Sequence, residues 1–342
     1  MTTKRVSVTS VTASLRHSAA NAGDVSCFGC GVGRAVSFVI FVAMRSVPFV
    51  ATFIVFIVAT VAAGQAPFRS GIETVTVTVT VVDASNRLIT GLTKDDFQVS
   101  ENGQAQPITQ FSDQRVPVSV GMLLDISDSM FGQPIVDARG SFDRFVGDLL
   151  QPEDEAFVAL FNHVPRIVAL WTRPASSLKG RLDSVRPTGG TAIYDALIAA
   201  APLFGHRLNP RAALVVISDG ADTASDHTIQ QARDVLRRSD PFVYAIAIDS
   251  AERTRPSTRV NPDALRDITG PSGGYTEVVR SAADLGPATE RIANELNRQY
   301  TLGYTAPKPP DGEWRSIRVR LRNRDYFARA RRGYFAVPSR KS

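Results

Sequence analysis

The hydrophobic pattern after residue 70 begins with an alternation typical of a β-strand. Residues 72–82 place valine and threonine at alternate positions, and a period of two predicts a strand with one buried face. Residues 83–87 have the composition of a turn. Asn102-Gly103, between Phe97 and the apolar stretch 108–111, is a strong hairpin signal. We therefore expect residues 70–114 to form a small β domain of roughly three to five strands.

From Pro117 onwards, apolar strand patterns alternate with helical ones. Strands are predicted at 118–124, 156–161, 166–171, 212–218 and 242–248. Helices are predicted at 134–150, 176–185, 192–204, 228–238, around Asp263, and at 283–299. This order predicts an α/β fold over residues 117–300, with a doubly wound, mainly parallel, Rossmann-like sheet covered on both faces. Ligands of such sheets bind beyond the carboxyl ends of the strands.

The chain returns to a β pattern after Gln299, with strands expected at 300–305, 316–324 and 326–337. We assign residues 300–338 to a C-terminal β segment. Its middle strand alternates apolar residues with a ladder of four arginines, Arg318, Arg320, Arg322 and Arg324. Such a ladder could bind phosphate or an anionic polysaccharide. We favour a solvated strand face, which also discourages edge-to-edge aggregation.

The first 63 residues have the composition of a leader. No charged residue occurs from 46 to 68, Met44-Arg45 precedes the apolar stretch, and Val61-Ala62-Ala63 offers small residues. These features predict a secretory signal that starts at Met44 and is cleaved before Gly64. The alternative is an uncleaved anchor through 46–68, long enough for a bilayer core of about 30 Å. Both predict a secreted, periplasmic or cell-surface protein.

The net charge of +6 is concentrated at the two ends of the chain. Residues 1–63 carry +4 and residues 313–342 carry +8, which leaves −6 for the centre. The basic balance is therefore no argument that the central domain binds nucleic acid. The only cysteines, Cys27 and Cys30, lack nearby residues to complete a zinc site.

Three loops supply the residues of a candidate metal site. Asp125, Ser127 and Ser129 follow a buried strand at alternate positions, Thr191 follows two glycines before a helix, and Asp219 ends the most apolar strand. These five side chains offer hard oxygen donors without sulfur or imidazole, which favours Mg²⁺ or Mn²⁺. We expect the loop after Asp125 to be exposed to solvent. Asp128 and Asp222 lie nearby in sequence and either adjust the site from outside the ligand set or are ordinary loop residues.

The order of these motifs resembles the von Willebrand factor type A family over roughly residues 117–300. The resemblance implies a metal-ion-dependent adhesion site in which Ser127, Ser129 and Thr191 coordinate directly, while Asp125 and Asp219 act partly through water. It also implies that a Glu or Asp of a protein partner completes the coordination. The whole mature chain resembles the VWFA-related domain proteins of Acidobacteria, which share Gly91-Leu-Thr-Lys-Asp-Asp-Phe97 and the ending Arg332-Gly-Tyr-Phe.

We therefore expect an exported, non-enzymatic binding or adhesion protein that uses a divalent cation to capture an acidic group on a protein ligand. One alternative is a structural or assembly subunit whose metal only ties the loops together. A metal-dependent hydrolase is a third possibility. The sequence offers no positioned His or Glu base to support it.

Overall fold

The computed structural model describes residues 73–249 and 261–337. The predicted leader of residues 1–63, with its apolar stretch and both cysteines, lies outside this part of the chain. Among the described residues, no helix has the length and apolar character needed to cross a membrane.

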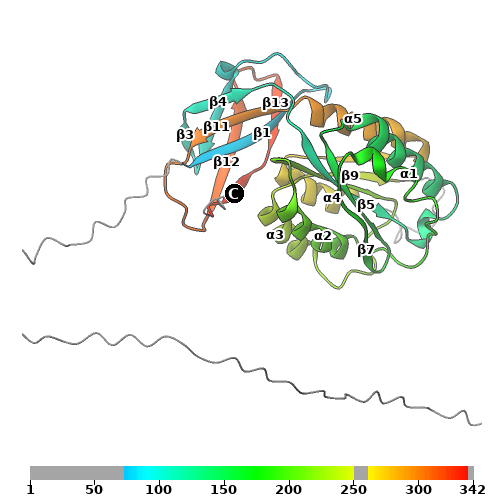
Figure 1. The fold of residues 1–342 in the computed structure, drawn as a ribbon. Helices are drawn as coiled ribbons and strands as arrows, with labels where there is room; N and C mark the ends of the chain where they lie inside the picture. Colours follow the sequence, from blue (N-terminus) through cyan, green and yellow to red (C-terminus); the bar gives the residue numbers. More distant parts are fainter. Residues whose placement is uncertain (1–72, 250–260, 338–342) are drawn as a thin grey trace, which may run out of the picture. The chain divides into compact units, whose positions relative to one another are not determined.

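The centre of the chain forms an α/β domain around a six-stranded sheet in the order β10-β9-β8-β5-β6-β7 (Figure 1). All pairs in this sheet are parallel except β6 with the edge strand β7. The strands are β5 (Val118–Asp125), β6 (Glu155–Phe161), β7 (Pro165–Thr172), β8 (Arg211–Ser218), β9 (Phe242–Ile248) and β10 (Thr276–Val279). The predicted α/β fold with a mainly parallel sheet is confirmed.

Helices bury apolar residues against both faces of this sheet, which explains why its central strands are apolar throughout. The helices are α1 (Gln133–Arg144), α2 (Ile193–Ala200), α3 (Ile229–Ser239), α4 (Pro262–Thr269) and α5 (Leu285–Asn297). Residues of α1 and α5 share one core cluster with the sheet, and residues of α2, α3 and α4 share the other.

The prediction of a helix at 176–185 is wrong. Only Ala175–Leu178 forms a short 3-10 helix, and turns follow it. Leu178, Leu182 and Val185 are all buried, so their helix-like spacing reflects burial of a compact turn structure. Gly180 lies between them with a φ of 73°, a left-handed conformation that interrupts a right-handed helix.

The remaining strands form two four-stranded sheets, in the orders β13-β1-β11-β4 and β14-β12-β2-β3 (Figure 1). Strands that precede the α/β domain are β1 (Thr74–Asp83), β2 (Phe97–Glu101), β3 (Gln104–Gln106) and β4 (Ile108–Ser112). Strands that follow it are β11 (Tyr300–Thr305), β12 (Trp314–Leu321), β13 (Tyr326–Ala330) and β14 (Gly333–Phe335). The first strand, β1, pairs with β11 and β13, and β2 pairs with β12. Each sheet therefore contains strands from both sides of the α/β domain, packed around a shared core of valines and tyrosines.

A buried carboxylate on α5 joins the β-sheets to the α/β domain. Glu295 accepts hydrogen bonds from Thr80 in β1, at 3.0 Å, and from Tyr244 in β9, at 2.8 Å. It also forms an ion pair with Arg329 in β13. Burial raises the pKa of Glu295, although these three partners oppose the rise.

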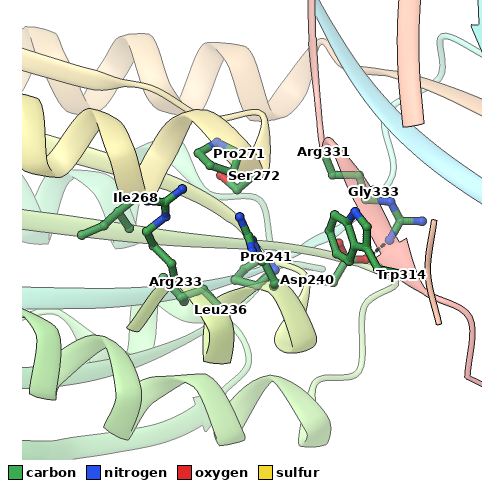
Figure 2. A pocket seen from close by; sticks show the side chains of 11 residues that line it. Arg233, Leu236, Asp240, Pro241, Ile268, Pro271, Ser272, Trp314, Arg331 and Gly333 are labelled. Carbon is green, nitrogen blue, oxygen red and sulfur yellow. Dashed lines mark hydrogen bonds and ion pairs between the residues drawn. The ribbon is translucent and has the colours of Figure 1, made fainter. Parts of the chain in front are cut away.

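A second contact joins the end of α3 to the C-terminal strands. Arg331 forms an ion pair with Asp240 (Figure 2). It also donates a 2.7 Å hydrogen bond to the Thr76 carbonyl. Arg237 lies over the Trp314 ring, with 5.7 Å between its guanidinium carbon and the ring centroid. Both residues line the small pocket of Figure 2. The Glu295 contact therefore fixes the C-terminal strands against α5, and the Arg331 contact fixes them against α3.

Candidate functional site

The predicted site residues lie at the carboxyl ends of neighbouring parallel strands. Asp125 is the last residue of β5, and Asp219 directly follows β8. Since β5 and β8 pair in parallel, the two carboxylates emerge at the same edge of the sheet. Thr191 lies two residues before α2, in the loop that faces this edge.

Backbone hydrogen bonds hold the three loops together. The Asp128 amide donates to the Gly189 carbonyl at 2.9 Å, and the Thr188 amide donates to the Ile126 carbonyl at 2.8 Å. On the other side, the Thr223 amide donates to the Thr191 carbonyl at 2.8 Å. The chain itself therefore positions the loops relative to one another.

Asp125 is the most enclosed of the candidate ligands. Its side chain is fully buried, with Oδ1 accepting from the Ser127 amide at 2.8 Å and Oδ2 from the Ser218 hydroxyl at 2.5 Å. The expectation that this part of the loop is exposed is wrong for Asp125 and for Ser127, which is also buried. The second loop is bonded to Ile126 and Asp128 and lies against this segment, so both residues are shielded although they lie at a strand end.

A chain of short oxygen contacts connects the first loop to the third. The Ser127 and Ser129 hydroxyls lie 2.8 Å apart, and the Ser129 hydroxyl donates to Asp219 Oδ1 at 2.6 Å. Thr191 lies against the third loop, because a Cβ placed on Gly220, which follows Asp219, would lie 3.0 Å from the Thr191 hydroxyl. The structure thus brings Ser127, Ser129 and Asp219 into contact, with Asp125 bonded to the Ser127 amide and Thr191 next to Gly220.

These oxygen separations are hydrogen-bond lengths, and they are also close to the spacing of ligands around a small, hard cation. Ligand distances of about 2.0–2.1 Å around Mg²⁺ place neighbouring ligands of an octahedron about 2.9 Å apart. The contacts of Ser129 with Ser127 and Asp219, at 2.8 and 2.6 Å, are close to that spacing. In the described residues, no group of three or more His, Cys, Asp or Glu could hold a metal. Any cation at this site would therefore depend on hydroxyl ligands together with the two carboxylates.

The two accessory aspartates differ in their surroundings. Asp222 Oδ2 accepts hydrogen bonds from the Tyr194 amide and, at 2.6 Å, from the Ser225 hydroxyl, which connects the third loop to the start of α2. Burial, with a smaller contribution from the Asp222 charge, raises the pKa of the Tyr194 phenol. Asp128 is exposed.

Two residues of the site carry no signal that sequence reasoning could have used. Ser218 holds the buried carboxylate of Asp125, but in sequence it is only the last residue of an apolar strand. Gly220 leaves room for Thr191, and a glycine after Asp219 reads as an ordinary turn residue. Both roles depend on which strands become neighbours, and that becomes known only with the fold.

Residues 120–221 match the von Willebrand factor type A domain family. The match includes most of β5, all of β8 and all five candidate ligands. Together with the mainly parallel sheet and its two helical layers, it shows that the α/β part of the chain has the von Willebrand factor type A fold. No curated protein matches the chain.

Several solved structures are similar to this chain at low sequence identity. A von Willebrand factor type A protein from Catenulispora acidiphila is 13% identical, with a TM-score of 0.47, over 79% of this chain and 74% of that one. The conserved hypothetical protein BatB from Bacteroides thetaiotaomicron is 22% identical, with a TM-score of 0.44, over 52% and 97%. The vWF domain of the type V pili tip protein Mfa5 from Porphyromonas gingivalis is 14% identical, with a TM-score of 0.41, over 54% and 96%.

Proposed function

We propose that this chain is an exported binding protein that captures an acidic group of a protein partner through a divalent cation, Mg²⁺ or Mn²⁺. The cation would be held by Asp125, Ser127, Ser129, Thr191 and Asp219. The observation that carries this proposal is the chain of oxygen contacts from Ser127 through Ser129 to Asp219 at the carboxyl ends of β5 and β8.

Each loop has a distinct part in this proposal. Ser127, Ser129 and Thr191 supply neutral hydroxyl ligands, and Asp219 supplies charge next to Ser129. Asp125, oriented by Ser218, fixes the first loop and contributes the second carboxylate. When bound, the cation supplies a positive charge that a Glu or Asp of the partner can coordinate. Two carboxylates balance a divalent charge, so a third from the partner adds to a site that is neutral rather than strongly negative.

The alternative of a metal that only ties the loops together is less well supported. The first loop is already bonded to the second through Asp128 and Thr188, and the second to the third through Thr223. Because these bonds lie within the chain, the loops need no metal to be held together. The hydroxyl ligands are then better explained by binding of a partner.

Metal binding is tested by titration calorimetry with Mg²⁺ and Mn²⁺. Asp125→Asn, Thr191→Ala and Asp219→Asn should each lower cation affinity by about tenfold or more, which corresponds to about 1.4 kcal/mol. Asp125→Asn is preferable to alanine, because alanine would leave the buried Ser218 hydroxyl without its acceptor. The matched control is Asp128→Asn, an exposed carboxylate in the same loop, which should change affinity by less than about twofold.

The proposal fails if none of the three site variants changes cation affinity. If Asp128→Asn removes binding while Asp125→Asn keeps it, the assignment of ligands in the first loop is wrong. Partner capture is a separate question, tested by recovering proteins from an extracellular extract with Mg²⁺ or with EDTA. Recovery that needs both Mg²⁺ and Asp125 supports binding through the cation, whereas equal recovery in EDTA favours the purely structural metal.

Export is tested on the secreted material itself. N-terminal sequencing of protein recovered outside the cytoplasm should give a start near Gly64 and no peptide containing Cys27 or Cys30. A stable, uncleaved chain in the membrane fraction would instead support anchorage through residues 46–68.

A further inference from the structure

A basic groove lies among the C-terminal strands, distinct from the residues of the proposed cation site. Its volume is about 960 Å³, and its lining includes the outward arginines Arg318 and Arg320 of β12. It also includes Arg332, just before β14, and the consecutive residues 328–330 of β13. We call this feature the arginine groove, and Figure 1 shows the two strands β12 and β13 that border it.

The lining of the arginine groove contains five arginines and no acidic residue. Two of the five are neutralised, because Arg329 pairs with Glu295 and Arg331 pairs with Asp240. Arg318, Arg320 and Arg332 are exposed and form no ion pair within the described part of the chain. Like charges this close repel one another, so an anionic occupant would relieve the repulsion.

One side of the arginine groove is the edge of a sheet. Strand β13 pairs with β1 alone and is the last strand of its sheet in the order β13-β1-β11-β4. Successive side chains of a strand point to opposite faces, so three consecutive residues at 328–330 line the groove through the strand edge. A sheet edge presents backbone N–H and C=O groups that another strand can pair with.

A glycine-rich turn closes one end of this edge. Gly270, Gly273 and Gly274 line the groove, and a Cβ placed on Gly273 would lie 2.7 Å from the carbonyl carbon of Ala330. The turn therefore lies against the last residue of β13. Its lack of side chains lets it approach the strand this closely.

From this combination of a free sheet edge and unpaired arginines, we propose that the arginine groove binds an extended acidic peptide, which adds as a strand to β13 and places alternate carboxylates against Arg318 and Arg320. Arg318 and Arg320 are two positions apart on one strand face, which separates them by about 6.6 Å along the strand. An extended peptide repeats its own side chains at the same interval, so a pattern of Glu or Asp at every second position matches the arginines.

The sheet edge decides between a peptide and other anions. A sulfated or uronic polysaccharide satisfies the arginines, but it has no repeating amide groups to pair with β13. Recognition by strand addition uses both elements, with main-chain hydrogen bonds for affinity and alternate side chains for specificity. The solvated-face interpretation of the arginine ladder predicts no preference between acidic sequences.

The test uses fluorescence anisotropy of the full chain with a dye-labelled peptide of about six residues, the usual length of a strand, in which Glu and Thr alternate. The control peptide has the same composition with its glutamates in one block.

Arg318→Gln combined with Arg320→Gln should weaken binding of the alternating peptide about tenfold, because two exposed ion pairs are lost. Arg322→Gln combined with Arg324→Gln is the matched control, because these ladder arginines do not line the groove, and it should change affinity by less than about twofold.

Strand addition is tested by methylating the backbone nitrogens of alternate residues in the peptide. Methylation in one phase removes the N–H groups that face β13 and should abolish binding, and methylation in the other phase should be tolerated. Binding should be unaffected by EDTA and by Asp125→Asn, which separates this site from the proposed cation site.

Three results would overturn the proposal. One is equal affinity for the alternating and block peptides, and another is full affinity of the Arg318→Gln/Arg320→Gln variant. The third is that the peptide still binds when it is methylated in either phase, and that heparin displaces it from the wild type but does not bind the Arg318→Gln/Arg320→Gln variant. That result would mean that the groove binds polyanions through charge alone.

Discussion

Thr80 in the first strand donates a 3.0 Å hydrogen bond to Glu295 in the last helix of the α/β domain, across a separation of 215 residues. Glu295 is almost completely buried, and its oxygens also accept from Tyr244 and Arg329. One carboxylate of α5 thus joins β1 and β13, in the sheet β13-β1-β11-β4, to β9 of the six-stranded sheet.

The pH dependence of stability should reflect this buried carboxylate. Burial raises the pKa of Glu295 above its usual value of 4.5, so the folded chain binds this proton more tightly than the unfolded chain does. The stability from that proton is fully present below the unfolded pKa and is lost as the pH rises through the higher folded pKa. Glu295→Gln keeps a neutral side chain at every pH. The unfolding free energy of the wild type, relative to Glu295→Gln, should therefore fall as the pH rises from about 4 towards neutrality.

Urea unfolding of both proteins across this pH range measures the difference directly, and other titrating groups cancel in the comparison. A difference that stays constant with pH, or that rises, would contradict the assignment of a raised pKa to Glu295.

A second buried ion pair should stabilise the two four-stranded sheets. Glu101 accepts hydrogen bonds from the Tyr304 hydroxyl at 2.6 Å and the Tyr334 hydroxyl at 3.0 Å, and it lies 3.7 Å from the buried Arg315 guanidinium. Glu101→Ala would leave this arginine without its buried partner and should cost about 3–5 kcal/mol of unfolding free energy.

The matched control for Glu101 is Asp311→Ala. Asp311 also pairs with Arg315, at 3.3 Å, but it is half exposed, so its loss should cost less than about 1 kcal/mol. Equal costs in denaturant unfolding would show that burial of Glu101 has no special effect.

Gly220 should influence the proposed cation site without being a ligand. A methyl group at this position would lie 3.0 Å from the Thr191 hydroxyl, so Gly220→Ala should displace Thr191 and weaken Mg²⁺ binding about threefold or more, or about 0.6 kcal/mol. Gly205→Ala is the control, because no atom lies within 4 Å of the added methyl group. Calorimetry that finds the same Mg²⁺ affinity for both variants would place Thr191 outside the ligand set.

Removal of the chain after Gln299 should destabilise the protein. It deletes β11 and β13, which are the two strands that pair with β1, and also β12, which pairs with β2. The valines of β1 would lose the buried tyrosines Tyr300 and Tyr304, and each such side chain contributes roughly 1.5–3 kcal/mol when buried. The expected product is insoluble or melts at a lower temperature, as measured by circular dichroism. A soluble product with an unchanged melting temperature would show that these strands are dispensable.

The sequence predicted local structure well wherever pattern and burial agree. The four alternating valines from Val75 to Val81 are all buried in β1, where Thr80 between them is buried as well. The apolar run before Asp219 is the buried strand β8. The prediction failed at 176–185, because three buried residues at helix-like spacing cannot be distinguished from a helix without knowing the conformation of Gly180. It also omitted β10, a strand of only four residues.

The candidate site was predicted as a set of side chains, and the structure adds how they are held. Oxygen donors at strand ends can be found from sequence because they follow apolar runs. Burial of Asp125, and its hydrogen bond with Ser218, could not be predicted, since β5 and β8 become neighbours only through the sheet order. The pairing of β1 with β13 was equally hidden, because two compatible strand patterns about 250 residues apart carry no sign of their partnership.

The position of β1 has a consequence for biosynthesis. Thr80 pairs with Arg329, and the intervening chain includes the entire α/β domain. At about 5–20 residues per second, synthesis of the intervening chain takes on the order of 10–50 s, during which both edges of a valine-rich strand lack their native partners. Such long-range pairing slows folding, and an unpaired strand is a site for aggregation. The two four-stranded sheets can close only around a strand made long before its partners, so the nascent protein depends on β1 being kept apart from other chains until the last strands emerge.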